Sequence, residues 1–117
     1  MADGSAGDYK RVAVAFTSAL AARDYNAAYA MASRSYRDAT SVTALQAAFE
    51  AVVPIDWNTV GPIEIGQTME DWPGREPSDV GWVYVSVGGD TYSEAVTVVV
   101  TLDDRELKVR TAEFGRP

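Results

Sequence analysis

The chain has 117 residues, which is enough for one domain with a hydrophobic core and too few for two. Its net charge of −7, from 17 acidic and 10 basic residues, speaks against nucleic acid and anionic membranes as partners, because both attract a basic surface. The absence of cysteine and histidine excludes disulfides, thiolate catalysis, zinc sites built on thiolate or imidazole, and histidine acid–base chemistry within one chain.

The start of the chain, MADGSAG, lacks the basic and apolar regions of a signal peptide, and its small residues predict a flexible segment over residues 1–7. No apolar run approaches the roughly 20 residues that a membrane-spanning helix needs. An acidic surface of this kind keeps many small bacterial-type domains soluble. We therefore expect a soluble domain, either cytoplasmic or the trimmed part of an exported protein.

Two helices are predicted in the first third of the chain. The first covers residues 8–22, is rich in alanine, and repeats its larger apolar residues at one-turn spacing: Val12, Phe16 and Leu20. Asp24 is a good N-cap for the second helix, which runs from Tyr25 to about Ser33. The segment 33–40 is polar and has no periodic apolar pattern, so we expect irregular structure there.

A third helix follows, with Ser41 or Thr43 as its N-cap. Pro54 ends it, because proline disfavours helical geometry in the residue before it. Its predicted apolar stripe consists of Val42, Leu45, Ala48, Phe49 and Val52.

The second half of the chain predicts a four-stranded antiparallel sheet. Residues 63–69 alternate apolar and polar side chains, and Gly66 marks a bend or bulge in this strand. Three β-rich runs between residues 81 and 114 are separated by turn signals at Gly88-Gly89-Asp90 and Asp103-Asp104. Helices followed by antiparallel strands predict an α+β fold, in which three N-terminal helices pack on one side of a curved sheet.

The last of these runs alternates, which predicts one face toward the core and one toward solvent. The residues expected to face the core are Leu107, Val109 and Thr111. Those expected to face solvent are Lys108, Arg110 and Ala112.

The step from the first helix to the second resembles the opening of the NTF2-like (cystatin-like) superfamily. The similarity rests on the stretch from Phe16 to Tyr29, FTSALAARDYNAAY, with its aromatic residue, its leucine and the Asp-Tyr-x-x-Ala-Tyr step. A third helix ending near Pro54 and the long C-terminal meander extend the similarity over nearly the whole chain. The resemblance implies a cone-like single domain, a pocket between the helices and the concave sheet face, and often a homodimer formed through the sheet.

Members of this superfamily include steroid isomerases, dehydratases and nuclear transport factors, so the fold alone does not choose a function. Isomerase-like members carry a tyrosine where this chain has Phe16, and an aspartate base near the positions of Asp38 and Thr40. Dehydratase-like members use a histidine, which this chain lacks. We therefore expect a non-enzymatic domain that binds a small apolar ligand or a protein partner through its pocket or its sheet face.

Two alternatives stay open. An isomerase or lyase would use Asp38 as a base in apolar surroundings, with Tyr29 or Tyr36 donating a hydrogen bond to a ligand oxygen. An acidic inhibitor or accessory domain would use its negative charge to bind a basic protein. No metal or cofactor is expected, because the acidic pairs lack calcium-loop spacing and the paired glycines lack the helix and lysine of a phosphate loop.

The candidate ligand-binding residues are a carboxylate and five aromatic residues: Tyr29, Tyr36, Asp38, Trp57, Trp82 and Tyr84. Trp82 and Tyr84 lie two apart on one strand and so point the same way. Packing under the helices is the first expectation for them, and a dimer face is the second. The acidic residues Glu76 and Asp79 are expected to lie in a solvated turn.

Overall fold

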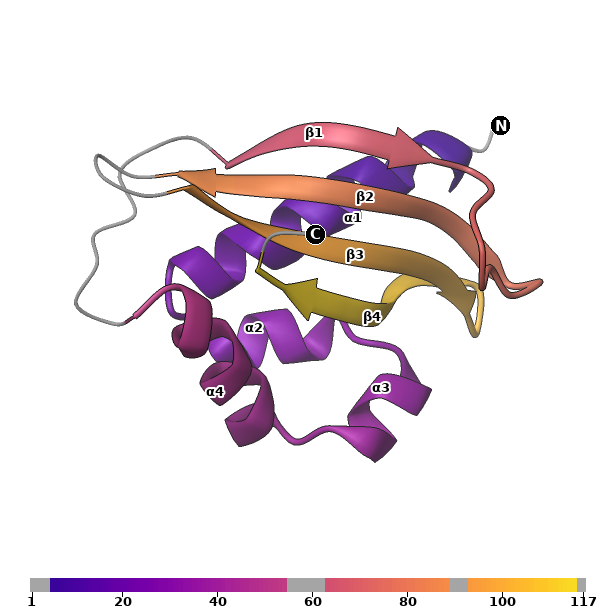
Figure 1. The fold of residues 1–117 in the computed structure, drawn as a ribbon. Helices are drawn as coiled ribbons and strands as arrows, with labels where there is room; N and C mark the ends of the chain where they lie inside the picture. The colour runs from indigo at the N-terminus through magenta and orange to yellow at the C-terminus, as the bar shows by residue number, and fades with distance from the viewer. Residues whose placement is uncertain (1–4, 55–62, 89–92, 116–117) are drawn as a thin grey trace.

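The computed structural model describes residues 5–54, 63–88 and 93–115, and it has the α+β architecture shown in Figure 1. The helices come first, as α1 (Ser5–Ala21), α2 (Tyr25–Ala30), α3 (Arg34–Ala39) and α4 (Val42–Val52). The strands follow, as β1 (Ile63–Met69), β2 (Asp79–Gly88), β3 (Ser93–Asp103) and β4 (Glu106–Phe114). They form one antiparallel sheet of order β1-β2-β3-β4, which confirms the predicted meander. No helix in the described part of the chain combines the length and apolarity needed to cross a membrane.

The structure has one helix more than the sequence predicted, because residues 34–39 form α3 instead of an irregular segment. The Ser33 hydroxyl caps α3 by accepting a hydrogen bond from the Tyr36 N–H at 3.2 Å. At the other end of α3, the Tyr29 hydroxyl donates a hydrogen bond to the carbonyl oxygen of Thr40 at 2.7 Å. No side chain of α3 is fully buried. The helix therefore depends on polar caps and shows no apolar periodicity in the sequence.

The other helices agree with the prediction except in three details, the first of which is that α2 ends at Ala30 and not near Ser33. Asp24 and Ser41 are the N-caps of α2 and α4, as expected. Helix α1 begins at Ser5, so residues 5–7, which we expected to be flexible, are helical. Ala48 is exposed and does not belong to the buried side of α4.

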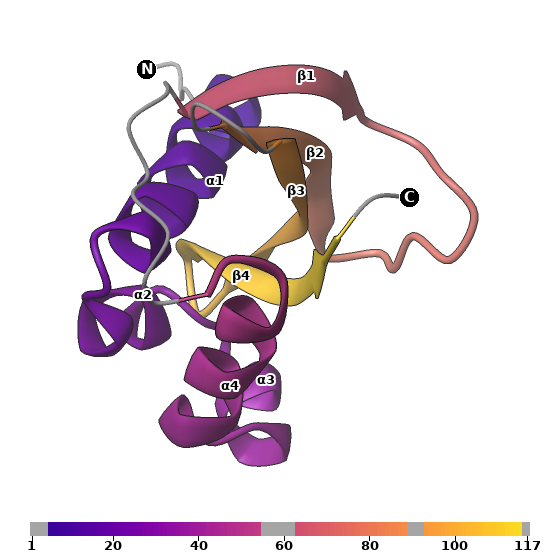
Figure 2. The ribbon, with the colours of Figure 1, turned by 60° about the vertical axis from the view of Figure 1, so that its left-hand side comes forward.

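Helix α1 lies in the concave side of the sheet, which curls around it in Figure 2. Helices α2, α3 and α4 lie beside β4 in both views of the ribbon. Large apolar side chains from α1, α4 and the sheet fill the interior, each at most 1% exposed: Tyr9, Phe16, Leu20, Leu45, Phe49, Val53, Val83, Val85, Val87, Val96, Val98, Val100 and Val109. The Tyr9 ring packs so closely on Gly81 that a Cβ there would overlap it. These described side chains lie between the helices and the sheet, where the resemblance implies a pocket.

The β1–β2 ladder contains the bulge predicted at Gly66. The register shifts between Ile65 and Gln67, which leaves Gly66 as the unpaired residue. The Tyr84 ring covers this glycine, and a Cβ on it would lie 3.0 Å from the ring. A bulge of this kind on an edge strand discourages pairing with another chain.

A second bulge, in β4, was not predicted. The register shifts so that Val109 pairs with Val100 and Thr111 with Val99, leaving Arg110 as the extra residue. One extra residue reverses the faces of everything after it. Thr111 therefore points to the outer face of the sheet and Ala112 packs against the core. This is the opposite of the alternation expected for these two residues.

The β3–β4 turn lies one residue later than predicted. Asp103 pairs with Glu106, so the central residues are Asp104 and Arg105. Both have left-handed backbones, with φ of 53° and 70°. Such angles are those of a type I′ hairpin turn, which strongly favours glycine at its second central position. Arg105 occupies that position here.

Candidate functional site

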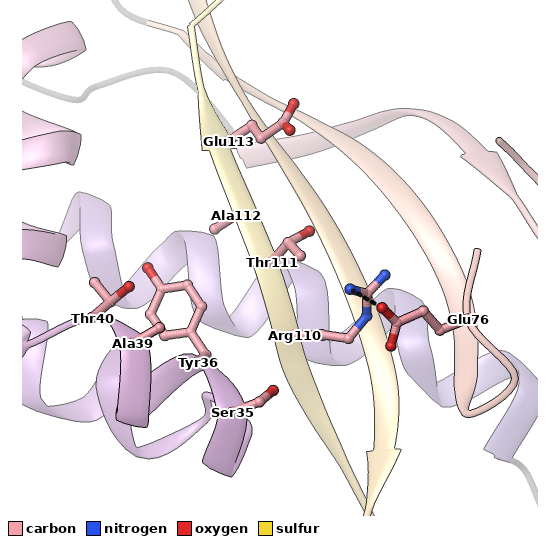
Figure 3. Close-up of a pocket in the computed structure, with 9 residues that line it drawn as sticks. All are labelled: Ser35, Tyr36, Ala39, Thr40, Glu76, Arg110, Thr111, Ala112 and Glu113. Carbon is pink, nitrogen blue, oxygen red and sulfur yellow. Dashed lines mark hydrogen bonds and ion pairs between the residues drawn. The ribbon is translucent and has the colours of Figure 1, made fainter. Parts of the chain in front are cut away.

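Two recesses in the described surface meet at β4. The first, which we call the α3–β4 cleft, has a volume of about 560 Å³ and lies between α3 residues 35–40 and β4 residues 110–113, with Glu76 at one side (Figure 3). The second, which we call the tryptophan groove, has a volume of about 330 Å³. It lies on the outer face of the sheet, where Trp72 and Trp82 form its aromatic walls. Three β4 residues line both recesses: Arg110, Thr111 and Glu113.

Tyr36 is the aromatic side chain that α3 places in the cleft. Figure 3 shows its ring between α3 and β4, close to Ala112. Burial raises the pKa of the Tyr36 hydroxyl, and the neighbouring Tyr29 adds to the rise. Among the described residues, none forms a hydrogen bond with this hydroxyl. It is therefore a neutral group at ordinary pH that can donate to a ligand or accept from one.

An ion pair between Arg110 and Asp79 holds β4 at the junction of the two recesses. Nε and Nη2 of Arg110 each donate to one carboxylate oxygen of Asp79 at 2.7 Å, and the Asp79 side chain is fully buried. Nη1 of Arg110 reaches the carboxylate of Glu76 at 3.3 Å. Because all three of its nitrogens have carboxylate partners, Arg110 is not a free cation for a ligand.

The same pair sets the ionisation of both groups. Burial alone would raise the pKa of Asp79, but hydrogen bonds from Arg110, from the Glu76 N–H and from Thr101 hold it below its usual value. The hydrogen bond with Asp79 raises the pKa of Arg110. A hydrogen-bonded pair of this kind stays charged over the physiological range.

This pair corrects the expectation that Glu76 and Asp79 lie together in a solvated turn. Glu76 is exposed, but Asp79 is only 2% exposed at the start of β2. Its partner Arg110 stands 31 positions later in the chain. No local sequence pattern indicates an ion pair between residues so far apart in the chain. Asp79 and Arg110 were therefore not identified as a pair from the sequence.

Trp82 and Tyr84 lie on the outer face of the sheet and not under the helices, which was their first expected place. The alternation of β2 gives the inward positions to Val83 and Val85, which are fully buried, and leaves the two aromatic residues half-buried outside. Trp82 lines the tryptophan groove. Tyr84 lies instead over Gly66. The structure thus separates these two predicted site residues.

Of the remaining predicted residues that the structure describes, Tyr36 lines the α3–β4 cleft. Asp38 is exposed on α3 and lines neither the cleft nor the groove. A catalytic carboxylate base would need apolar surroundings, which this side chain does not have. The Tyr29 hydroxyl is used to hold the end of α3. Trp57 lies outside the described residues.

A further recess, of about 470 Å³, lies between α1, α2 and the start of β4. We call it the α1–α2 groove, and its lining is mostly apolar: Val12, Ala15, Ala27, Ala30, Met31 and Leu107. Arg11 and Lys108 complete the lining. Among the described residues, no three acidic side chains gather into a group that could hold a metal ion.

Comparisons of this chain with known protein families, with characterised proteins and with solved structures gave no match. The geometry of the recesses is therefore the basis for inferring a function.

Proposed function

We propose that this chain is a non-enzymatic NTF2-like domain that binds a protein partner through the α3–β4 cleft and the adjoining tryptophan groove. The observation that carries this proposal is the contrast between the fully buried side chains that the described residues place between helices and sheet and the two open recesses that share β4. An enzyme or a cone-type ligand carrier of this class would need an open space between helices and sheet. Here Phe16, Phe49 and Tyr9 fill it.

The side chains around β4 suit a protein interface. Trp72 and Trp82 are half-buried and face a common groove, and tryptophan is among the residues that contribute most to binding energy in interfaces. Arg110, which lines both recesses, is already paired with Asp79 and Glu76, so binding there would not bury an unpartnered guanidinium. The net charge of −7 favours encounter with a basic partner.

A small apolar ligand is the second candidate, favoured by the apolar lining of the α1–α2 groove. Its binding would leave β4 residues 110–113 unaffected, since that groove contacts β4 only at Leu107 and Lys108. The two candidates therefore predict responses in different parts of the molecule. A homodimer through the outer face would be a third outcome, because Trp82 and Tyr84 lie there.

The test is an amide NMR titration of the full chain, first with a pool of short peptides and then with a pool of small apolar compounds. We expect the peptides to shift the amides of α3 and of β4 residues 110–113. The Trp82→Ala variant should weaken that binding about tenfold, as expected for loss of a buried aromatic contact. Tyr84→Ala is the matched control, because Tyr84 lies on the same strand and face but outside the groove.

Three results would count against the proposal. Shifts confined to the α1–α2 groove would favour the small-ligand candidate. Concentration-dependent shifts over the outer face without any ligand would favour the homodimer. Equal weakening by the two variants would mean that the tryptophan groove has no specific part in binding.

A further inference from the structure

We infer that the partner is an extended polypeptide segment that adds to the sheet as a strand along the free edge of β4. This inference rests on the proposed function, because it names how the α3–β4 cleft would hold its partner. Strand addition needs an unpaired edge, room beside it, and recesses for alternate side chains.

The edge of β4 already pairs with a short segment from within the chain, residues 31–33. The Val109 N–H donates to the Met31 carbonyl and the Val109 carbonyl accepts from the Ser33 N–H, both at 2.8 Å. Ala32 and Val109 thereby form a parallel bridge. The chain then turns into α3, and β4 continues with no described strand on that side. The bridge shows that this edge has the geometry for strand pairing.

Beyond Val109, the edge presents unpaired backbone groups. Backbone groups of successive residues in an antiparallel ladder point alternately toward the partner strand and away from it. Val109 points away from β3, whereas Gly115 donates to Ala95 of β3 at 2.9 Å. With Arg110 as the extra residue, Ala112 and Phe114 must then point away. Among the described residues, none bonds to their N–H or C=O groups.

The cleft supplies the room and one set of side-chain positions. Ala112 forms part of the cleft wall, so the unpaired edge opens directly into it. A residue paired with Ala112 would place its side chain on the same face, toward Tyr36 and Ala39. The unpartnered Tyr36 hydroxyl lies in the same space and could accept from, or donate to, the added backbone (Figure 3). Small or β-branched apolar residues suit this side.

The other set of side chains would face the outer surface beside Thr111 and Glu113. Glu113 is exposed, and no described residue forms an ion pair with it. Among the described residues, Arg110 is the one cation that lines the cleft, and Asp79 and Glu76 already hold it. Lysine or arginine opposite Glu113 would gain a cross-strand ion pair. The partner is therefore a segment in which apolar and basic residues alternate.

A single strand fits this edge better than a second copy of the chain. Helices α3 and α4 lie beside β4 in both Figure 1 and Figure 2. If two copies paired edge to edge, each would have to place its sheet where the other has these helices. One added strand needs only a spacing of about 4.8 Å from β4.

The experiment measures amide hydrogen exchange of Ala112 and Phe114 in the full chain. The probe is a pool of short synthetic peptides in which lysine alternates with valine, isoleucine or threonine. Strand addition should slow the exchange of both amides about tenfold or more as the peptides approach saturation. Peptides that are N-methylated at the residues facing β4 should bind about tenfold more weakly, because each loses a backbone hydrogen bond.

Two variants and one matched control make the test specific. Glu113→Lys should weaken binding of the lysine peptides about fivefold and favour the corresponding glutamate peptides. Glu64→Lys is the matched control, since Glu64 is an exposed glutamate on β1, at the other edge of the sheet. Ala112→Pro removes an edge N–H without removing a bond to β3 and should abolish strand addition. If that variant fails to fold, the N-methylated peptides still decide the question.

The outcomes separate the two proposals. In one outcome, peptides shift the amide signals of Tyr36 and Ala39 without slowing the hydrogen exchange of Ala112 and Phe114. That result would overturn strand addition and leave the proposed function standing. Equal binding by the N-methylated peptides would do the same. No response anywhere in the α3–β4 cleft or the tryptophan groove would overturn both.

Discussion

The concave face of the sheet and the free edge of β4 are built in opposite ways by the same chain. On the concave face, α1 brings aromatic and aliphatic side chains against a layer of valines, α4 adds Leu45 and Phe49 from beside β4, and these described side chains are fully buried. At the edge of β4, the neighbouring helix α3 buries no side chain fully, and the backbone of Ala112 and Phe114 stays unpaired among the described residues. Apolar burial supplies most of the driving force for folding. The edge of β4 can therefore bind a partner without loss of the packing that stabilises the core.

The contrast has a simple origin in the sequence. Strands β2 and β3 place valine at nearly every inward position, which favours strand structure and fills the space under α1. Helix α3 reads RSYRDA, in which only Tyr36 and the alanine are apolar. Such a helix cannot seal a sheet edge. The difference in side chains alone thus explains why one region closes and the other stays open.

The largest effect is expected at Asp79, which joins the two regions by holding the bulged residue Arg110. Asp79→Asn should lower the free energy of unfolding by about 3 kcal/mol, because removing one partner leaves a largely buried guanidinium with only Glu76. Urea denaturation measures this change. Glu76→Gln is the control and should cost under about 1 kcal/mol, since Glu76 is more than half exposed. If both variants lowered the free energy of unfolding equally, the buried Arg110–Asp79 pair would stabilise the fold no more than the exposed Arg110–Glu76 pair does.

The lowered pKa of Asp79 also predicts that the stability of the fold depends on pH. Its pKa in the folded chain is lowered, so its stabilisation is fully present above the unfolded value of about 3.9. The stabilisation is lost as the pH falls through the folded pKa. Unfolding of the wild type and of Asp79→Asn, measured from about pH 6 downward, should therefore give free energies that converge in acid. A constant difference between the two would contradict a lowered pKa.

A smaller effect is expected on the concave face alone. Gly81→Ala should destabilise the fold by about 2 kcal/mol, because the new methyl group overlaps the Tyr9 ring in a tightly packed site. Gly88→Ala, on the same strand, is the matched control, since a Cβ there meets nothing within 4 Å. Peptide binding by the folded Gly81→Ala chain should match that of the wild type. Loss of binding along with stability would mean that the concave face and the β4 edge are not independent.

The contrast between these regions also marks what the sequence could predict. Periodic apolar residues predicted the long helices, β-rich runs between turn signals predicted the strands, and a glycine within a strand predicted the bulge at Gly66, because each of these is a local pattern. Helix α3 was missed because it relies on polar caps and shows no apolar periodicity in the sequence. The faces of Thr111 and Ala112 were reversed because no local signal marks the bulge at Arg110. The burial of Asp79 depends on that same distant residue. Tyr36 and Trp82 were named as site residues, but the recesses they line follow from the bulge and from α3.

The smallest effect is expected at the β3–β4 turn, which lies outside both regions. Arg105→Gly should stabilise the fold by about 0.5–1 kcal/mol, because glycine adopts the left-handed backbone of this position without the steric cost that arginine carries. Thermal or urea unfolding measures the gain. Arg23 has a similar φ of 64°, but its guanidinium donates to the carbonyl oxygens of Val53 and Pro54. Arg23→Gly should therefore destabilise, since the lost hydrogen bonds outweigh the relief of backbone strain. If both glycine variants stabilised the chain, the Arg23 bonds would have no net value and α4 would be held by its apolar packing alone.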